Sequence, residues 1–201
     1  RETHSLWNQF TGEPVIGPLA ASGIALKQRP VAIATWEDWR RRNPGTRVLS
    51  LSTGHRRDYG SGVVYREYFA SRELMFPALV DQRVLSQKDY IFGIRQVGVA
   101  RAWPLSAFQG GRVINDAIGD LPIVLVGDMA GRTVRAYERG GRRFIPGPSD
   151  DVLVEEGRAW RIGEEGLTAP DGATLPRIAG HIAYWFAWNN YLGQRAELYS
   201  G

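Results

Sequence analysis

The pattern of apolar and polar positions predicts mostly β-strands in the second half of the chain. Runs of apolar and β-branched residues are typical of strands, and a short apolar stretch after Pro104 favours a single helical turn. The expected strands cover residues 90–94, 97–103 and 111–114, and the expected turn covers residues 105–108. The most apolar run, residues 122–126, predicts a central strand buried on both faces.

Two further segments are predicted from their turn residues. Residues 133–139 alternate between apolar and polar side chains, and Gly140 and Gly141 then lead into residues 143–145, which indicates a β-hairpin. The stretch 166–180 is rich in Gly and Pro and predicts a connection on the surface. The whole pattern is that of a mainly β protein with few short helices.

Short helices are expected where two Trp residues stand three positions apart. Thr35 is suited to cap the first helix, and Asn-Pro-Gly at 43–45 ends it, because Pro clashes with a further turn. The second helix is expected over 181–191, ending before Gly193. Aromatic residues at helical spacing are usually core residues. We therefore assign five residues to a structural aromatic core: Trp36, Trp39, Trp103, Trp185 and Trp188.

The Trp pairs also indicate an internal duplication. The aligned positions are Trp36 with Trp185, Trp39 with Trp188, Gly45 with Gly193, Arg47 with Arg195 and Ser52 with Ser200. This alignment predicts pseudo-two-fold duplicated β-rich units, each with a short W-x-x-W helix. Residues 1–85 would hold the remainder of the first unit and a connection, and residues 86–201 would hold the second, packed as one globular body.

Composition and charge limit the classes of function. With 43% hydrophobic and 23% charged residues among 201, the chain is an ordinary globular protein, which excludes disordered and collagen-like classes. No apolar run approaches the roughly 18 residues that a membrane span needs. The absence of Cys excludes disulfides, thiolate metal sites and cysteine nucleophiles. The net charge of +4 is far below that of a typical nucleic-acid surface, so no nucleic-acid partner is expected.

Several ordered motifs resemble those of one known family. They are T-W-E-D-W (35–39), N-P-G-T-R-V-L-S (43–50), M-F-P-A-L-V-D-Q (75–82), A-R-A-W-P-L (100–105), V-I-N-D-A-I-G-D-L-P-I-V-L-V-G-D (113–128) and W-F-A-W (185–188). Together, from Ser5 to Leu198, they resemble the uncharacterised prokaryotic domain-of-unknown-function family 3179. This resemblance supplies an architecture and no mechanism.

The resemblance also implies a longer protein. Family members have a T-Y-C-P-L-C motif in a preceding unit, at the place where this chain has residues 126–131. The chain would then be a processed product or a fragment that starts partway through the first unit. The resemblance favours an exported or envelope-associated protein, with association with a membrane complex, although the sequence itself leaves the compartment unknown.

The best candidate for a metal site is His55 with Asp58. Asp58 could orient the imidazole of His55 for metal binding. The alternative is a simple turn in which Asp58 pairs with a neighbouring Arg, and this alternative is favoured because no two histidines share a helical or strand spacing. We expect neither a metal nor a cofactor.

Three polar residues flank the expected central strand: Asn115, Asp116 and Asp128. Carboxylates at strand ends can serve acid–base chemistry or bind cations, but they also form turns with their own backbone. The turn interpretation is favoured. Ser61 lies between two glycines without the strand-to-helix context of a nucleophile elbow, so no catalytic residue is expected.

An aromatic and basic stretch is the best candidate for a partner-binding surface. Its residues are Arg57, Tyr59, Tyr65, Arg66, Tyr68, Phe69 and Arg72. Aromatic and Arg side chains are enriched in protein interfaces. We therefore expect a non-catalytic binding or accessory-subunit domain that docks to a protein partner or to the family's preceding unit. The alternative is a metal- or redox-linked enzyme whose reactive cysteines lie in that preceding unit.

Overall fold

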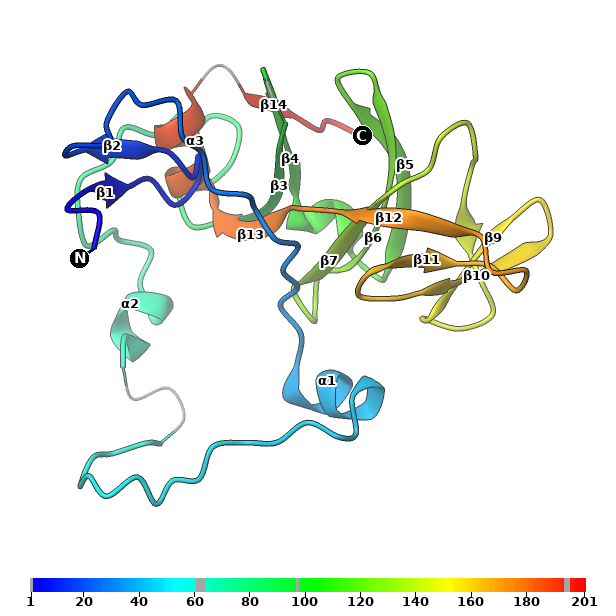
Figure 1. The fold of residues 1–201 in the computed structure, drawn as a ribbon, viewed down its shortest axis with the longest axis horizontal. Helices are drawn as coiled ribbons and strands as arrows, with labels where there is room; N and C mark the ends of the chain where they lie inside the picture. Colours follow the sequence, from blue (N-terminus) through cyan, green and yellow to red (C-terminus); the bar gives the residue numbers. More distant parts are fainter. Residues whose placement is uncertain (1, 61–63, 97, 194–195) are drawn as a thin grey trace.

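The computed structural model describes residues 2–60, 64–96, 98–193 and 196–201 (Figure 1). The strands are β1 (Leu6–Trp7), β2 (Pro14–Ile16), β3 (Tyr90–Gln96), β4 (Val99–Pro104), β5 (Arg112–Ile118), β6 (Leu121–Asp128), β7 (Thr133–Glu138), β8 (Ile145–Pro146), β9 (Val152–Glu155), β10 (Arg158–Ile162), β11 (Gly166–Thr168), β12 (Thr174–Ile178), β13 (His181–Tyr184) and β14 (Ala196–Leu198). The helices are α1 (Trp36–Arg42), α2 (Arg66–Ala70), α3 (Trp185–Leu192) and the 3₁₀ turn η1 (Leu105–Phe108). The mainly β class expected from the sequence is confirmed.

Eight strands form one large antiparallel sheet in the order β5-β6-β7-β12-β11-β10-β9-β8. The sheet curls until its two edges meet. Asn115 in β5 donates from its side-chain nitrogen to the Phe144 carbonyl at 2.7 Å and accepts from the Phe144 backbone N–H at 2.8 Å, directly before β8. The amide side chain of Asn115 thus makes the two hydrogen bonds that a backbone pair would make between neighbouring strands. The sheet is a nearly closed barrel.

A smaller sheet, in the order β13-β3-β4-β14, packs beside the barrel. Its last pair, β4 with β14, is parallel, and the other pairs are antiparallel. Helix α3 lies against this sheet, with Trp188 so close to Gly93 that a Cβ there would lie 2.2 Å from the indole ring. A side chain at position 93 would therefore displace α3.

Buried apolar side chains form three clusters. The cluster inside the barrel contains Val124, Tyr137, Phe144, Leu153, Trp160, Leu167 and Ala169. Because side chains alternate along a strand, the neighbouring residues of β6 and β7 point the other way. They pack with Phe92, Trp103 and Phe108 in a second cluster between the barrel and the smaller sheet. The third cluster, with Trp185 and Trp188, lies between the smaller sheet and α3.

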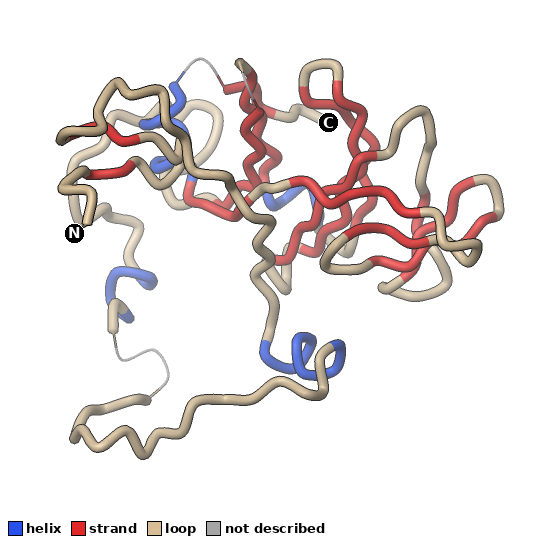
Figure 2. The backbone as a smooth tube through the Cα atoms, in the orientation of Figure 1, coloured by secondary structure: helices blue, strands red, loops and turns tan. Residues whose placement is uncertain are grey.

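The residues that precede β3 are mostly loops, and between α1 and α2 they form a wide loop that stands away from the two sheets (Figure 2). The hairpin β1–β2 lies beside α3, where the ring of Phe10 is 5.2 Å from His181 and 5.3 Å from Tyr191, centroid to centroid. Helix α1 lies against the barrel. Between α1 and β3 runs a stretch that we call the outer segment, residues 44–60 and 64–79, which includes α2.

Several expected elements are confirmed. The expected strands 90–94, 111–114 and 122–126 overlap β3, β5 and β6, and η1 is the expected turn at 105–108. The expected strand 97–103 corresponds to β4, although residue 97 lies outside the described residues. Thr35 caps α1 by accepting a hydrogen bond from the Asp38 backbone N–H at 3.2 Å.

The prediction of a hairpin at Gly140 and Gly141 is wrong. After β7 the chain does not return along β7, and β8 pairs with β9 instead. The Arg139 guanidinium donates to the carbonyls of Ile123 at 3.0 Å and Arg142 at 2.7 Å, which turns the chain toward Asn115. A side chain that binds backbone carbonyls has here replaced the backbone pairing of a hairpin.

Two other expectations need correction. Residues 166–180 are not a surface connection, because they form β11 and β12, and β12 joins the two halves of the barrel by pairing with β7. Alternating apolar residues such as Leu167 and Leu175 outweigh the Gly and Pro content. The helix expected over 181–191 begins only at Trp185, because residues 181–184 pair with β3 as strand β13.

The structure does not show the expected duplication. Both Trp pairs begin helices, α1 at Trp36 and α3 at Trp185, as the sequence alignment requires. Their surroundings differ, however, because Trp36 is 51% exposed and Trp185 only 5%. Residues 46–52 form no strand in the described structure, whereas 196–198 form β14, and Arg195 lies outside the described residues. The duplication and the division at residue 85 stay predictions.

Candidate functional site

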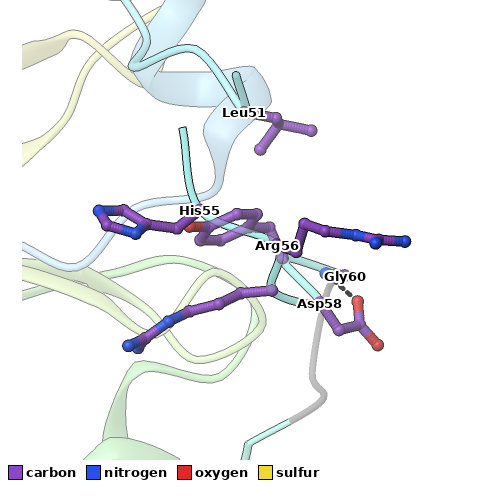
Figure 3. A pocket seen from close by; sticks show the side chains of 7 residues that line it. Leu51, His55, Arg56, Asp58 and Gly60 are labelled. Atoms are coloured by element: carbon purple, nitrogen blue, oxygen red, sulfur yellow. Dashed lines mark hydrogen bonds between the residues drawn. The ribbon is translucent and has the colours of Figure 1, made fainter. Parts of the chain in front are cut away.

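The expected metal site at His55 lies in the outer segment, at an open hollow lined by Leu51 and residues 55–60 (Figure 3). Figure 3 shows His55 and Asp58 pointing away from each other. Asp58 instead accepts a hydrogen bond from the Gly60 backbone N–H at 2.7 Å. Neither the metal-site geometry nor the alternative pairing of Asp58 with Arg is present among the described contacts. Asp58 shapes its own turn.

Within the described part of the chain, no three His, Cys, Asp or Glu side chains come together as metal ligands. The hollow at His55 is also formed by one stretch of chain alone, without a second element to fix its shape.

The residues expected to bind a partner lie on the outer segment. Tyr59, Tyr65 and Phe69 are 43%, 58% and 61% exposed, and Arg57 and Arg72 are also exposed. Arg66 begins α2. Tyr68 is partly covered, because the Lys88 ammonium lies 3.6 Å from its ring centroid and donates to the Tyr68 carbonyl. Lys88 thereby fastens α2 to the body.

The structure brings only part of this set together. The rings of Tyr68 and Phe69 lie 5.9 Å apart on α2, centroid to centroid. Tyr59 lies farther back along the segment and bonds the Thr53 hydroxyl at 2.7 Å. The expected patch is thus a series of exposed side chains along an extended segment, with one short helix at its centre.

The aromatic core assignment is confirmed for Trp103, Trp185 and Trp188, which are 0%, 5% and 0% exposed. It is wrong for Trp36, which is half exposed, and Trp39 is only partly buried. The cause is the position of α1: it rests on the rim of the barrel with its charged residues Asp38, Arg41 and Arg42 toward the barrel mouth, and none of its residues is buried. The Trp39 indole N–H instead donates to the Thr46 hydroxyl at 2.9 Å.

A larger cavity, missed by the sequence analysis, lies at one open end of the barrel. It measures about 760 Å³ and is enclosed by α1, by the facing ends of β5, β6 and β7, and by the loop 146–150. Its floor includes Val113, Val126, Leu153 and Ile162, which belong to the cluster inside the barrel or pack against it. We call this space the barrel-mouth cavity.

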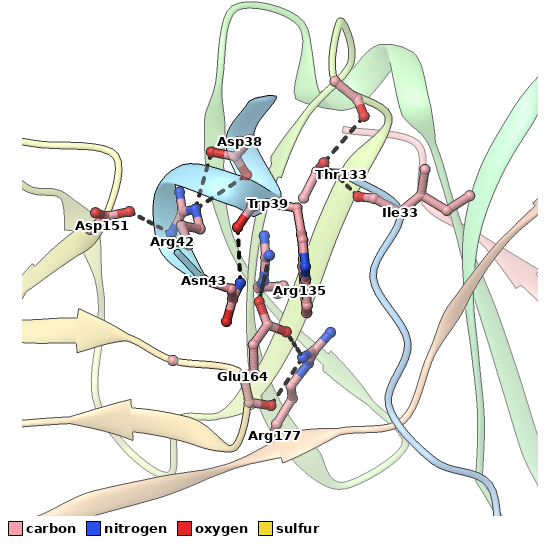
Figure 4. Close-up of polar contacts among 12 residues, drawn as sticks. Ile33, Asp38, Trp39, Arg42, Asn43, Thr133, Arg135, Asp151, Glu164 and Arg177 are labelled. Atoms are coloured by element: carbon pink, nitrogen blue, oxygen red, sulfur yellow. Dashed lines mark hydrogen bonds and ion pairs between the residues drawn. The ribbon is translucent and has the colours of Figure 1, made fainter. Parts of the chain in front are cut away.

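A buried charged group stands beside this cavity (Figure 4). Arg135 donates to Glu164 Oε1 from Nη2 at 2.6 Å and from Nε at 3.0 Å. Arg177 donates to Glu164 Oε2 and, at 3.0 Å, to the Glu164 carbonyl. The side chains of Arg135 and Arg177 are only 6% and 5% exposed. Two buried guanidinium groups therefore share one carboxylate.

The charge states of this group follow from its surroundings. Burial alone would raise the pKa of Glu164, but the hydrogen bonds and charges of Arg135 and Arg177 outweigh it and lower the pKa. Burial raises the pKa of the neighbouring Tyr137 to about 12, and its hydroxyl donates to the Gly163 carbonyl at 2.8 Å. Glu164 is therefore ionised and Tyr137 neutral at physiological pH.

Helix α1 closes one side of the cavity through polar contacts, as Figure 4 shows. Arg42 donates from Nε to both Asp38 oxygens at 3.1 and 3.2 Å and forms an ion pair with Asp151 in the loop before β9. Thr133 at the start of β7 donates to the Ile33 carbonyl at 2.6 Å, just before the helix. These contacts fix α1 over the barrel mouth.

The three polar residues that flank the central strand have structural partners. Asn115 closes the barrel, and Asp128 accepts the Gly131 backbone N–H at 2.6 Å in the turn that follows β6. Asp116 lies inside β5, so the prediction that it forms a turn is wrong. It accepts the Trp103 indole N–H at 2.8 Å and pairs with Arg101 at 3.1 Å, which joins the barrel to the smaller sheet.

One signal in the sequence could have revealed the barrel-mouth cavity. Along 133–139, Arg135 shares its strand face with Tyr137, a core residue of the barrel. A guanidinium on the apolar face of a strand needs a partner charge, because an unpaired buried charge is unfavourable. That partner, Glu164, lies 29 positions away and joins it only through the barrel topology.

The fold and these surfaces define the class of protein: a cysteine-free, mainly β domain with a nearly closed barrel, a cavity at its mouth and a long exposed segment. The chain belongs to a family described as "Protein of unknown function (DUF3179)", whose model matches residues 1–195. This match confirms the resemblance given by the ordered motifs. No curated protein and no solved structure matches the chain.

Proposed function

We propose that this chain is a non-catalytic binding or accessory-subunit domain that docks to a protein partner through the outer segment. The resemblance to the family favours an exported or envelope-associated setting for this role. No described helix is long and apolar enough to span a bilayer. The proposal rests on one observation, which is the distribution of exposed apolar side chains.

Exposed and buried apolar side chains are divided unequally along the chain. All the large apolar residues of the buried core lie at or after Ile91. The outer segment, by contrast, exposes ten large apolar side chains: Val48, Leu49, Leu51, Tyr59, Val64, Tyr65, Phe69, Met75, Phe76 and Leu79. Exposure of this many large apolar side chains along one segment favours a protein interaction site. A partner surface that covers these side chains would remove them from water.

The chemistry of the segment defines the kind of partner. It carries five arginines, Arg47, Arg56, Arg57, Arg66 and Arg72, against three carboxylates, Asp58, Glu67 and Glu73. Aromatic anchors surrounded by Arg are typical of the energetic centres of protein interfaces. The complementary surface is therefore a protein face with apolar pockets and an acidic rim.

The segment is also fastened at one point, which limits the entropy lost on docking. Lys88 Nζ donates to the carbonyls of Tyr68 and Ser71, at 2.5 and 2.7 Å, and Gln87 donates to the Arg72 carbonyl. Helix α2 is thus held at the body while Phe69 stays exposed. This arrangement suits α2 to be the first contact with a partner.

The alternative, a metal- or redox-linked enzyme, needs groups that this sequence does not have. Its reactive cysteines would belong to the preceding unit of the family and not to this chain, which has no Cys. A docking role is compatible with such an enzyme, because the preceding unit could itself be the partner.

The proposal can be tested by co-purification from cells that make this protein. Tagged wild-type chain is compared with a Tyr65→Ser/Phe69→Ser variant and with a control, Tyr191→Ser, which removes an aromatic side chain that is 56% exposed on α3. We expect one protein to be recovered in equimolar amount with wild type and control and to be lost with the double variant. Cross-links to it should fall within the outer segment.

Two results would contradict the docking role. One is equal recovery of the same protein with the double variant. The other is a wild-type chain that runs as a bare monomer while turning over a substrate. Circular dichroism of the double variant checks that its fold is intact, which is expected because both substituted side chains lie outside the core.

A further inference from the structure

The barrel-mouth cavity has the size and floor of a small-molecule site. Its volume of about 760 Å³ lies within the range of known ligand pockets, and barrel mouths are frequent locations for them. The floor is apolar: Val113, Val126 and Ile162 are only partly buried, and Leu153 is 1% exposed. An apolar group placed on this floor would continue the packing of the barrel core.

The buried group beside the cavity carries more positive than negative charge. Arg135 and Arg177 bring two positive charges, and Glu164 supplies one negative charge. Arg177 Nε is buried with no hydrogen-bond partner in the described structure. A buried positive charge without a counter-charge is unfavourable, so this group favours the approach of an anion. Arg135 is the member of the group that lines the cavity.

Other charged residues of the lining form ion pairs with one another or hydrogen bonds to the backbone. Asp38 accepts from both Arg41 and Arg42, and Asp128 accepts a backbone N–H of its own turn. The remaining lining charges on the rim are Glu37 and Asp150 against Arg112. Because the carboxylates of this rim outnumber Arg112, selectivity for an anion depends on Arg135 at the inner wall.

We propose that the barrel-mouth cavity binds a small amphipathic carboxylate, with its acidic group at Arg135 and its hydrocarbon part on the floor formed by Val126, Leu153 and Ile162. Guanidinium groups bind carboxylates through charge-assisted hydrogen bonds, which supplies the polar half of the recognition. Burial of the hydrocarbon part supplies the apolar half. This site is independent of the outer segment and of the proposed docking role.

Calorimetric titration of the full chain with octanoate tests the proposal. We expect binding to one site, and binding of octylammonium, which has the same chain length and the opposite charge, at least tenfold weaker. Failure of octanoate to bind, or equal binding of octylammonium, would overturn the proposal. Neither result would affect the docking role, which concerns a protein and another surface.

Two variants locate the site. Ile162→Trp fills the cavity and should abolish octanoate binding, and Arg135→Gln should weaken it by about tenfold or more, as expected for loss of a charge-assisted hydrogen bond. Arg161→Gln is the matched control, because Arg161 is adjacent on β10 and exposed, outside the cavity lining. Unchanged binding in Ile162→Trp would overturn the proposal.

Photolabelling of the wild-type chain needs no variant and remains decisive if a substitution disturbs folding. An alkyl carboxylate with a diazirine in its chain is cross-linked to the protein, and labelled peptides are identified by mass spectrometry. Labels should fall in peptides that contain Val126, Leu153 or Ile162, and excess octanoate should suppress them. Labels confined to the outer segment would show non-specific apolar binding and would overturn the proposal.

Discussion

At the scale of single residues, large aromatic side chains determine how the smaller sheet is covered. Trp188 is completely buried and lies on Gly93, where no side chain competes for the space. Its neighbours include Phe10 and His181, with ring centroids at 6.3 and 5.8 Å. The sequence indicated this burial from the spacing of the aromatic residues alone. It could not distinguish Trp188 from Trp36, because the same spacing occurs in a helix that rests on the rim of the barrel.

Replacement of Trp188 by Ala should therefore be strongly destabilising. The loss of a fully buried indole and the cavity left behind predict a decrease of about 3–5 kcal/mol in the free energy of unfolding. Trp36→Ala, on a side chain that is 51% exposed, is the control and should cost less than about 1 kcal/mol. Urea denaturation measures both values. A small loss at Trp188 would contradict its role in the core.

His181 gives the fold a predicted pH dependence. Burial lowers the pKa of His181 below its ordinary value of 6.5, so the unfolded chain binds the proton more readily than the folded one. This contribution to stability is complete above the unfolded pKa and is lost as the pH falls below about 6.5. The unfolding free energy of wild type should therefore decrease, relative to that of His181→Phe, between pH 7.5 and 5.5. Parallel pH profiles of the two proteins would contradict this.

At the scale of elements, strands with uniform apolar patterns were predictable, whereas elements that depend on partners elsewhere in the chain were not. The central strand β6 follows directly from its sequence. The hairpin after β7 was expected from Gly140 and Gly141, but Arg139 and Asn115 direct the chain elsewhere. In the same way, residues 181–184 form β13 because their backbone pairs with β3. Helix α3 therefore starts only after β13. These partners are distant in the sequence, so local patterns could not reveal them.

The closure of the barrel by Asn115 can be tested by substitution. Asn115→Ala leaves the N–H and carbonyl of Phe144 without their partners, which should lower the unfolding free energy by roughly 2–4 kcal/mol. Asn190→Ala, on an exposed residue of α3, serves as the control. Hydrogen exchange at the Phe144 amide should become faster in the first variant only. An unchanged rate there would show that β5 and β8 are held together by other contacts.

At the scale of the whole molecule, the chain combines a packed body with a segment that has little packing of its own. The part of the chain from β3 to β14 holds the buried residues of all three clusters, and the outer segment exposes most of its apolar residues. The sequence indicated the aromatic and basic character of this segment, including Tyr65 and Phe69. Its sign of the barrel-mouth cavity was limited to Arg135 on the apolar face of β7, because the cavity is formed by residues from six strands and one helix that meet only in the folded chain.

The central claim, that the outer segment is a docking surface, is tested most directly by hydrogen–deuterium exchange of the chain alone and in complex with the protein that co-purifies with it. In the isolated chain, amides of β3 to β7 should exchange slowly and those of residues 44–60 and 64–79 rapidly, because few of the latter have backbone partners. In the complex, new protection should appear in residues 64–79, around α2. Protection confined to other surfaces, or none at all, would contradict the account.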